Sequence, residues 1–285
     1  MSTKTLNVVI GPTAIGKTAF SIELAKKLNT EIVSADSRQF YKEMSIGTAV
    51  PSNQELKEVK HHFIHHKSIH DNYNVGQFEK EGIEKITSLF KTNDQLILTG
   101  GSGLYIDAIC KGLNFFPNIS SSTRTKLRED YDRHGIKWLK EQVKKMDPVY
   151  YQQVDKENAQ RLLRCLEVCV QTNQTYSSFK SPETKKRDFN IKYFVLTMDR
   201  ERLYQRINKR VDMMMENGLL DEVKSLNEFR NLNALQTVGY KEIFDFIDQN
   251  HTLERAVELI KQNSRRYAKR QLTWLKKYPA SPIEA

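Results

Sequence analysis

A glycine-rich segment near the start of the chain has the residue types and spacing of a phosphate-binding loop, G-x-x-x-x-G-K-[ST]. It consists of Gly11, Pro12, Thr13, Ala14, Ile15, Gly16, Lys17 and Thr18. The glycines let consecutive backbone N–H groups point into one concavity, Lys17 supplies a mobile cation, and the Thr18 hydroxyl can ligate Mg²⁺. The segment predicts a magnesium-dependent site for a diphosphate or triphosphate. It does not say whether the phosphates belong to a nucleotide.

A single carboxylate follows the second apolar run of the sequence. Asp36 comes just after residues 31–34, which are predicted to form a strand. In a doubly wound parallel sheet the ligands bind beyond the carboxyl ends of the strands, so Asp36 is expected near the phosphate-binding loop. There it could act as a general base, as a magnesium ligand, or, with Ser37, as a helix cap. Spacing leaves all three roles open.

Strands that alternate with helices must position these groups. Residues 8–10 form an apolar run, residues 18–28 repeat apolar side chains at helical spacing, and further strands are predicted at 31–34, 95–99 and 191–197. This order predicts an α/β fold: a P-loop doubly wound parallel sheet core with an inserted helical subdomain and a helical C-terminal region.

The helical insertion separates two parts of the core. Ser120 begins a long charged helix that Asp147 and Pro148 end, and a second helix is expected over residues 157–171. The predicted divisions are a first core part at 1–114, an insertion at 115–189, and core completion with basic C-terminal helices at 190–285.

The chain is basic, and much of the excess charge is local. Its 285 residues contain 45 Lys and Arg against 35 Asp and Glu, a formal net charge of +10. Residues 255–278 hold eight Lys or Arg against one acidic residue, Glu258, with Tyr267 and Trp274 between them. A helix of this composition favours contact with an RNA backbone over a merely solvated face.

Cysteine spacing does not predict a metal site. Cys165 and Cys169 are four residues apart, but no third ligand stands near them in sequence, and Cys110 is distant. The paired histidines His61, His62, His65 and His66 have a spacing that suits one helix face and could serve a metal. Three cysteines fit a reducing compartment. With no signal-peptide pattern and no long apolar run, a cytoplasmic protein is expected.

Several motifs together resemble one enzyme family, the tRNA dimethylallyltransferases. The first three are the phosphate-binding loop, SADSRQFY at 34–41, and IGTA at 46–49 with Pro51. The similarity continues through 61–62, GGSGLY at 100–105, 147–148, 160–162, 166–168, VGY at 238–240 and AKRQLTW at 268–274. It covers nearly the whole chain.

The resemblance implies transfer of a dimethylallyl group from dimethylallyl diphosphate to the exocyclic N6 amine of the adenosine immediately 3′ of the anticodon. Residues 13–18 would hold the diphosphate with Mg²⁺, Asp36 would be the general base, and Lys17 and Ser102 would complete the catalytic set. Many family members have threonine at the position of Ser102. The segment Asp36, Ser37, Arg38 and Gln39 would meet the target nucleotide.

Contacts with the tRNA anticodon stem-loop are implied for the insertion. They fall on Arg124, Gln160, Arg161, Leu162, Leu163 and Arg164. A monomer that does not associate with membranes is expected. A nucleoside or small-molecule kinase would share the loop and the aspartate, but it would not need the basic terminal helix. An RNA-binding NTPase switch would need a magnesium-binding aspartate after residues 95–99, where the sequence has glycine instead.

Overall fold

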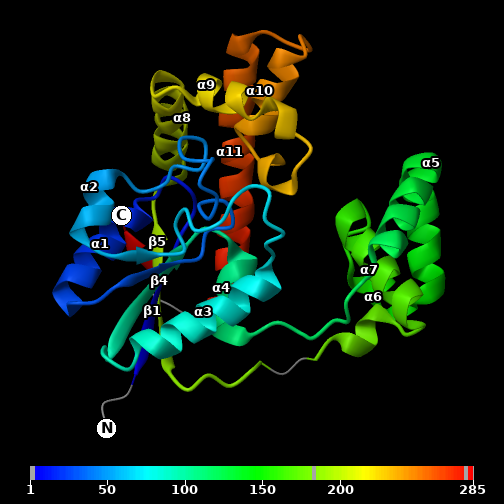
Figure 1. The fold of residues 1–285 in the computed structure, drawn as a ribbon, viewed down its shortest axis with the longest axis horizontal. Coiled ribbons are helices and arrows are strands. Elements are labelled where there is room, and N and C mark those ends of the chain that lie inside the picture. Colours follow the sequence, from blue (N-terminus) through cyan, green and yellow to red (C-terminus); the bar gives the residue numbers. More distant parts are fainter. Residues whose placement is uncertain (1–3, 182–183, 279–281, 285) are drawn as a thin grey trace. The chain divides into compact units, whose positions relative to one another are not determined.

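The computed structural model describes residues 4–181, 184–278 and 282–284 (Figure 1). The chain forms two compact units, one of residues Met1–Lys111 with Lys186–Ala285, and one of residues Gly112–Lys185. An insertion was expected at 115–189. The second unit starts three residues earlier than this range and ends four residues earlier. None of the described helices combines the length and hydropathy of a membrane-spanning segment.

The first unit is built on a parallel sheet with the strand order β3-β2-β4-β1-β5-β6. The strands are β1 (Thr5–Ile10), β2 (Ile32–Ser34), β3 (His61–His62), β4 (Gln95–Gly100), β5 (Asn190–Thr197) and β6 (Pro282–Glu284). The four strands predicted from the sequence are confirmed within a few residues, whereas the short edge strands β3 and β6 carry too few apolar residues to stand out.

Helices bury both faces of this sheet. Leu6, Val8 and Ile10 of β1 belong to one hydrophobic cluster, and Val9 belongs to another, because successive side chains of a strand point to opposite faces. The helices of this unit are α1 (Lys17–Leu28), α2 (Asn53–Glu58), α3 (Val75–Leu89), α4 (Gly103–Lys111), α8 (Arg200–Glu216), α9 (Leu219–Ser225), α10 (Tyr240–Ile247) and α11 (Leu253–Leu275). The α/β prediction is therefore confirmed.

The second unit is helical and has its own core. Its elements are α5 (Ser121–Met146), α6 (Pro148–Gln153), α7 (Ala159–Thr172) and the 3₁₀ helix η1 (Tyr176–Phe179). The helix boundaries predicted at Ser120 and Asp147 are formed by capping hydrogen bonds. The Ser120 side chain accepts from Thr123 N at the start of α5, and the Asp147 side chain accepts from Tyr150 N at the start of α6. Leu139 and Val143 of α5 pack in one cluster with the apolar face of α7.

A buried ion pair fixes the chain where it re-enters the first unit. Arg187 pairs with Glu79 of α3 at 3.0 Å, and both side chains are largely buried. Arg187 also donates to the carbonyl oxygens of Ala108 and Ile109 at the end of α4. A guanidinium there satisfies carbonyls that the helix leaves unpaired.

The carboxyl ends of β2 and β4 meet at a glycine. A Cβ added at Gly100 would lie 2.5 Å from the carbonyl oxygen of Ala35, which is backbone and cannot rotate away. Ala35 N in turn donates to Thr99 O at 2.7 Å. Because Gly100 has no side chain, the residue before Asp36 lies directly against β4.

We expect Gly100→Ala to destabilise the protein by about 1–3 kcal/mol, because the added methyl forces two strands apart. Urea denaturation measures the change. Gly82→Ala in α3 is the matched control: its added Cβ meets only the terminal Cδ1 of Ile109, which can rotate, and alanine favours the helix. Equal losses in the two variants would contradict the backbone constraint.

Candidate active site

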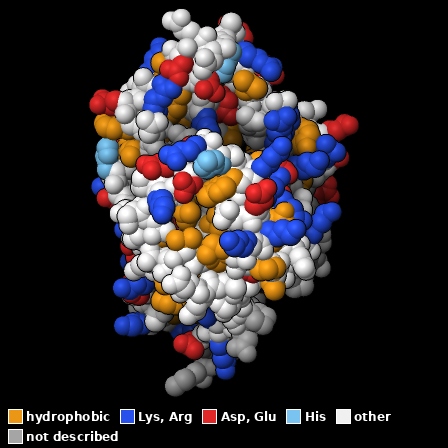
Figure 2. Space-filling view, turned by 90° about the vertical axis from the view of Figure 1, so that its right-hand side faces the viewer, with side chains coloured by type: hydrophobic (Ala, Val, Ile, Leu, Met, Phe, Trp, Pro, Cys, Tyr) orange, Lys and Arg blue, Asp and Glu red, His pale blue; other side chains and the backbone are white. Residues whose placement is uncertain are grey.

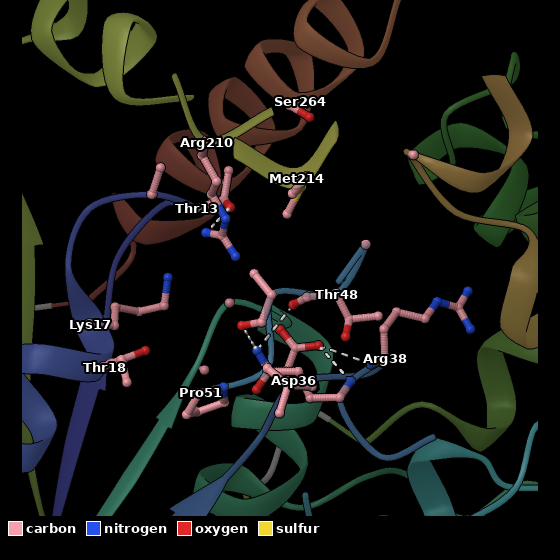
Figure 3. Close-up of a pocket in the computed structure, with 18 of the residues that line it drawn as sticks. Thr13, Lys17, Thr18, Asp36, Arg38, Thr48, Pro51, Arg210, Met214 and Ser264 are labelled. Carbon is pink, nitrogen blue, oxygen red and sulfur yellow. Dashed lines mark hydrogen bonds between the residues drawn. The ribbon is translucent and has the colours of Figure 1, made fainter. Parts of the chain in front are cut away.

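One cavity of about 840 Å³ opens at the carboxyl ends of the strands in the first unit (Figure 3). Its walls come from the phosphate-binding loop, the segment after β2, the loop at residues 47–51, the glycines after β4, and the helices α8 and α11. The arrangement agrees with the general rule for ligand sites in doubly wound sheets.

The phosphate-binding loop has the backbone shape of an anion site. Gly16, with a φ of 106°, occupies the left-handed region directly before α1. The Lys17 ammonium folds back and donates to Gly11 O at 3.1 Å and to Pro12 O at 2.8 Å. Of the eight predicted residues, Thr13, Ala14, Gly16, Lys17 and Thr18 line the cavity. Ile15 is buried in the core, so its side chain anchors the loop rather than facing a ligand.

Lys17 lies in an electrostatically unfavourable position while no anion is bound. Burial and, to a smaller extent, the charge of Arg210 lower its pKa to about 8, while the charge of Asp36 opposes the shift. Arg210, from α8, donates to Thr13 Oγ1 at 3.3 Å, and burial lowers the Arg210 pKa as well. Two desolvated cations beside loop amides are suited to receive a multiply charged anion.

Asp36 holds a turn and faces the cavity (Figure 3). Its Oδ1 accepts from Arg38 N at 2.9 Å and from Gln39 N at 3.3 Å. Capping, one of the three roles left open by the sequence, therefore occurs, although it stabilises a turn rather than a helix. Within the described residues no donor reaches Oδ2, which leaves that oxygen available for a proton or another ligand.

The predicted neighbours of Asp36 are held by each other. Ser102 Oγ accepts from Ser37 N at 3.0 Å and donates to Ser37 Oγ at 2.9 Å. The Gln39 side chain donates to the carbonyl oxygens of Thr48 and Ala49. Ser102 and Gln39 thus fix the segment after β2 and the loop that follows, while Arg38 lines the cavity.

Gln271 of α11 joins two loops of the site, and its role was not predicted. Its Oε1 accepts from Thr13 N at 2.8 Å, and its Nε2 donates to Gly101 O at 2.7 Å. Nearby, burial raises the pKa of Tyr267 to about 12, with a further contribution from Asp36. The motif at 268–274 was recognisable in the sequence, but spacing does not show that its glutamine reaches across the fold.

The loop at 45–47 depends on one carboxylate. Glu222 of α9 accepts from Ser45 N, Ile46 N and Gly47 N, and also from the Tyr240 hydroxyl at 2.6 Å. A Cβ at Gly47 would lie 2.5 Å from the Tyr240 ring. The motifs at 46–49 and 238–240, far apart in sequence, are therefore in direct contact in the fold.

Sequence reasoning also missed a row of cations on α8. Arg206, Lys209 and Arg210 line the cavity, and no ion pair with a described carboxylate involves them. Their spacing of three and four residues puts them on one helix face. The spacing is visible in the sequence, but the pattern alone does not show that this helix face borders the cavity.

The basic helix predicted at 255–278 is α11, and its aromatic residues have internal roles. Trp274 packs so closely that a Cβ at Gly103 would lie 2.4 Å from its ring, and it donates to Asp107. Tyr267 lines the cavity. An RNA-binding role for α11 would therefore depend on its exposed cations, such as Arg266 and Lys269. Figure 2 shows one face of the molecule, on which Lys and Arg side chains are numerous and interspersed with Asp and Glu.

In the second unit, the predicted tRNA-contacting residues divide into two groups. Arg124 of α5 and Arg164 of α7 both lie within 4.0 Å of the Glu167 carboxylate, at 3.8 and 3.2 Å, while Gln160 and Arg161 are exposed. The side chains of Leu162 and Leu163 are buried in the helical core, with 0% and 7% exposure. The expected RNA contact is corrected for these two side chains, because the apolar face of α7 packs against α5.

The four clustered histidines do not form a metal-ligating group among the described residues. His62 Nε2 lies 2.6 Å from Glu31 Oε2, and His61 Nδ1 lies 2.8 Å from Val59 O. His66 sits between aromatic rings, where burial and the charge of Lys67 lower its pKa to about 4. These residues stabilise the core beside β3.

The structure supplies a third neighbour for the cysteine pair that spacing could not show. Ligand atoms of Asp147, Cys165 and Cys169 lie within 4.8 Å of one another, and all three residues are buried. The Asp147 carboxylate already accepts hydrogen bonds from Tyr150 N and from Ser177 N and Oγ. We interpret the group as a capped helix start beside two core thiols.

We expect the binding of inorganic pyrophosphate to be linked to proton uptake by Lys17. Free Lys17 loses its proton near pH 8, and a bound anion restores the charged form, so affinity should fall by up to tenfold per pH unit above 8. Calorimetry at pH 8 in buffers of different ionisation enthalpy measures the uptake. Lys17→Met retains the ligand's own titration and is the control. The same buffer dependence in both proteins would contradict the assignment.

Comparison with known proteins agrees with this geometry. The model of the IPP transferase family matches residues 39–278. A tRNA dimethylallyltransferase from Flavobacterium johnsoniae is 52% identical over 96% of this chain and 91% of its own length. A solved full-length tRNA isopentenylpyrophosphate transferase from Bacillus halodurans is 37% identical, with a TM-score of 0.72 over 99% of this chain and 90% of that one. A eukaryotic dimethylallyltransferase solved acting on tRNA is 26% identical, with a TM-score of 0.77 over 99% of this chain and 74% of that one. The chain belongs to the IPP transferase family.

Proposed function

We propose that this protein transfers a dimethylallyl group from dimethylallyl diphosphate to the N6 amine of the adenosine immediately 3′ of the anticodon in tRNA. The observation that carries the proposal is that Lys17 and Asp36 line one cavity, close enough for the carboxylate charge to act on the Lys17 pKa. An anion site and a carboxylate base are the two parts such a transfer needs. The names of the relatives support the substrate pair.

The phosphate end of the cavity binds the donor diphosphate. The amides of residues 14–18 and the Lys17 ammonium hold it, while Thr13 N stays bonded to Gln271, and Arg206 and Arg210 approach from α8. As the carbon–oxygen bond to the diphosphate breaks, the leaving pyrophosphate gains negative charge where these donors are already fixed. The same groups therefore serve binding and catalysis.

Magnesium fits this end of the site. The Thr18 hydroxyl lines the cavity next to Lys17, and Mg²⁺ in such sites takes one or two protein oxygens together with phosphate oxygens and waters. The ion would neutralise phosphate charge, and Thr18 would hold it.

Asp36 acts as the general base. An adenine amine is a poor nucleophile because its lone pair is delocalised into the ring, so removal of its proton as the nitrogen–carbon bond forms contributes about 10²–10⁴-fold in rate. Asp36 Oδ1 is fixed by two backbone amides, so the carboxylate keeps its orientation while Oδ2 accepts the proton. Ser37, Arg38 and Gln39 hold the target nucleotide, which must leave the anticodon stack to enter the cavity.

The second unit binds the anticodon stem-loop through one cationic face. Arg124 and Arg164 share Glu167, and Arg161 is exposed beside them. A shared carboxylate orders the two guanidinium groups, and such planar donors match phosphate oxygens.

We expect Asp36→Asn to lower the transfer of label from dimethylallyl diphosphate to unmodified tRNA by at least a hundredfold, because the amide cannot accept the proton. The asparagine carbonyl oxygen can still accept from Arg38 N and Gln39 N, so the turn is retained. Pyrophosphate affinity, measured in parallel, should change little.

The control reaction offers ATP with nucleosides to the wild-type protein. Label in RNA that Asp36→Asn leaves unchanged would remove Asp36 as the base. Phosphate transfer to a nucleoside without label in RNA would overturn the proposed function in favour of a kinase.

We expect Arg124→Ala and Arg164→Ala each to weaken tRNA binding and to reduce by about one the slope of log affinity against log salt, because each removes one phosphate contact. Filter binding across a salt series measures the slope. Lys126→Ala is the matched control, since Lys126 is exposed on the same helix but, two residues from Arg124, projects from a different face. Slopes equal to wild type in both test variants would contradict an RNA role for this face.

A further inference from the structure

One face of α8 changes from cationic to apolar along the cavity. Arg206 and Arg210 lie toward the phosphate-binding loop, and Met213 and Met214 follow within the next turn. Met213 is a large hydrophobic side chain with 49% exposure, and it lines the cavity. Figure 3 shows Met214 pointing into the same space as Arg210 and Thr48. Residues four apart on a helix project from one side, so Arg206, Arg210 and Met214 form a single row.

The helix spacing provides a length scale for the donor. Four residues of an α-helix rise about 6 Å, which separates Arg210 from Met214 along the axis. The four-carbon backbone of a dimethylallyl group extends about 4 Å, since each carbon–carbon bond is about 1.5 Å. A five-carbon tail that runs along α8 from a diphosphate at Arg210 would therefore span most of the axial distance to Met214.

The surroundings of Met214 are apolar, in contrast to those of Asp36. Val238 and Ile260 line the cavity with it and belong to, or pack against, the same hydrophobic cluster. The hydroxyl and carboxylate groups at Ser37, Ser102 and Asp36 lie in the segments after β2 and β4 and suit a polar base. A hydrocarbon tail gains from burial against the apolar wall, and methionine adapts its shape to such a tail.

We propose that Met214 closes the prenyl subsite and limits the donor to five carbons. This inference rests on the proposed transferase function and adds to it the residue that selects the donor. Met213 of the same helix lines the cavity as well, and so do Thr48 and Val50 from the loop at 47–51.

The test compares dimethylallyl diphosphate with geranyl diphosphate as donors to unmodified tRNA. Met214→Ala should raise the ratio of kcat/KM for geranyl over dimethylallyl diphosphate at least tenfold, because discrimination by chain length in an apolar pocket depends on filled space. Met214→Val should give a smaller rise. Met215→Ala is the matched control, since Met215 lies on the same helix and packs against the same hydrophobic cluster as Met214, but it is not among the residues that line the cavity.

A second variant covers the case in which the alanine protein does not fold. Met214→Phe adds bulk, so it should raise KM for dimethylallyl diphosphate severalfold while the affinity for inorganic pyrophosphate stays at the wild-type value. A wild-type enzyme that transfers dimethylallyl, with donor ratios unchanged in the folded Met214 variants, would overturn the inference and leave the function standing. A wild-type protein that transfers neither group would overturn both.

Discussion

Backbone contact between the carboxyl ends of β2 and β4 is the constraint on which the site depends. Gly100 allows Ala35 to lie against β4, and the chain then turns at Asp36 beside the phosphate-binding loop. Gly101 and Gly103 repeat the principle, because Gln271 and Trp274 of α11 occupy the space their side chains would need. Three closely spaced glycines therefore let β4 and the residues after it lie against the end of β2 and against α11, and these segments border a single cavity.

Charge and shape divide the cavity between two reactants. Desolvated cations from the phosphate-binding loop and α8 make one end attractive to a diphosphate, and their mutual repulsion is relieved when an anion binds. The carboxylate of Asp36 stands at the other end, oriented by backbone amides. Separate elements carry the two ends, so the donor and the acceptor can be recognised by different physical means.

Local patterns were enough to predict the core strands, the long helices and the phosphate-binding loop. They rest on interactions between near neighbours in sequence, such as the strand alternation at 8–10 and the cap at Ser120. Gln271 and Glu222 could not be predicted, because their partners are Thr13 and Ile46, far away along the chain. Leu162 and Leu163 show a second limit of sequence-based prediction. The motif identified the helix, but only the packing of α7 shows which of its side chains are accessible.

The anchoring of Arg187 has a consequence for how the family can vary. Its guanidinium binds the end of α4, where the helical unit leaves the core, and its own position is where that unit returns. The unit from Gly112 to Lys185 can therefore be treated as one long loop inserted into the core, and the hydrogen bonds of Arg187 hold the two ends of this loop together. The entropy lost on closing a loop grows only slowly with loop length. Insertions that enlarge or reshape the helical unit would therefore cost the core little stability, so this unit can change in size and surface while the cavity of the first unit keeps its geometry.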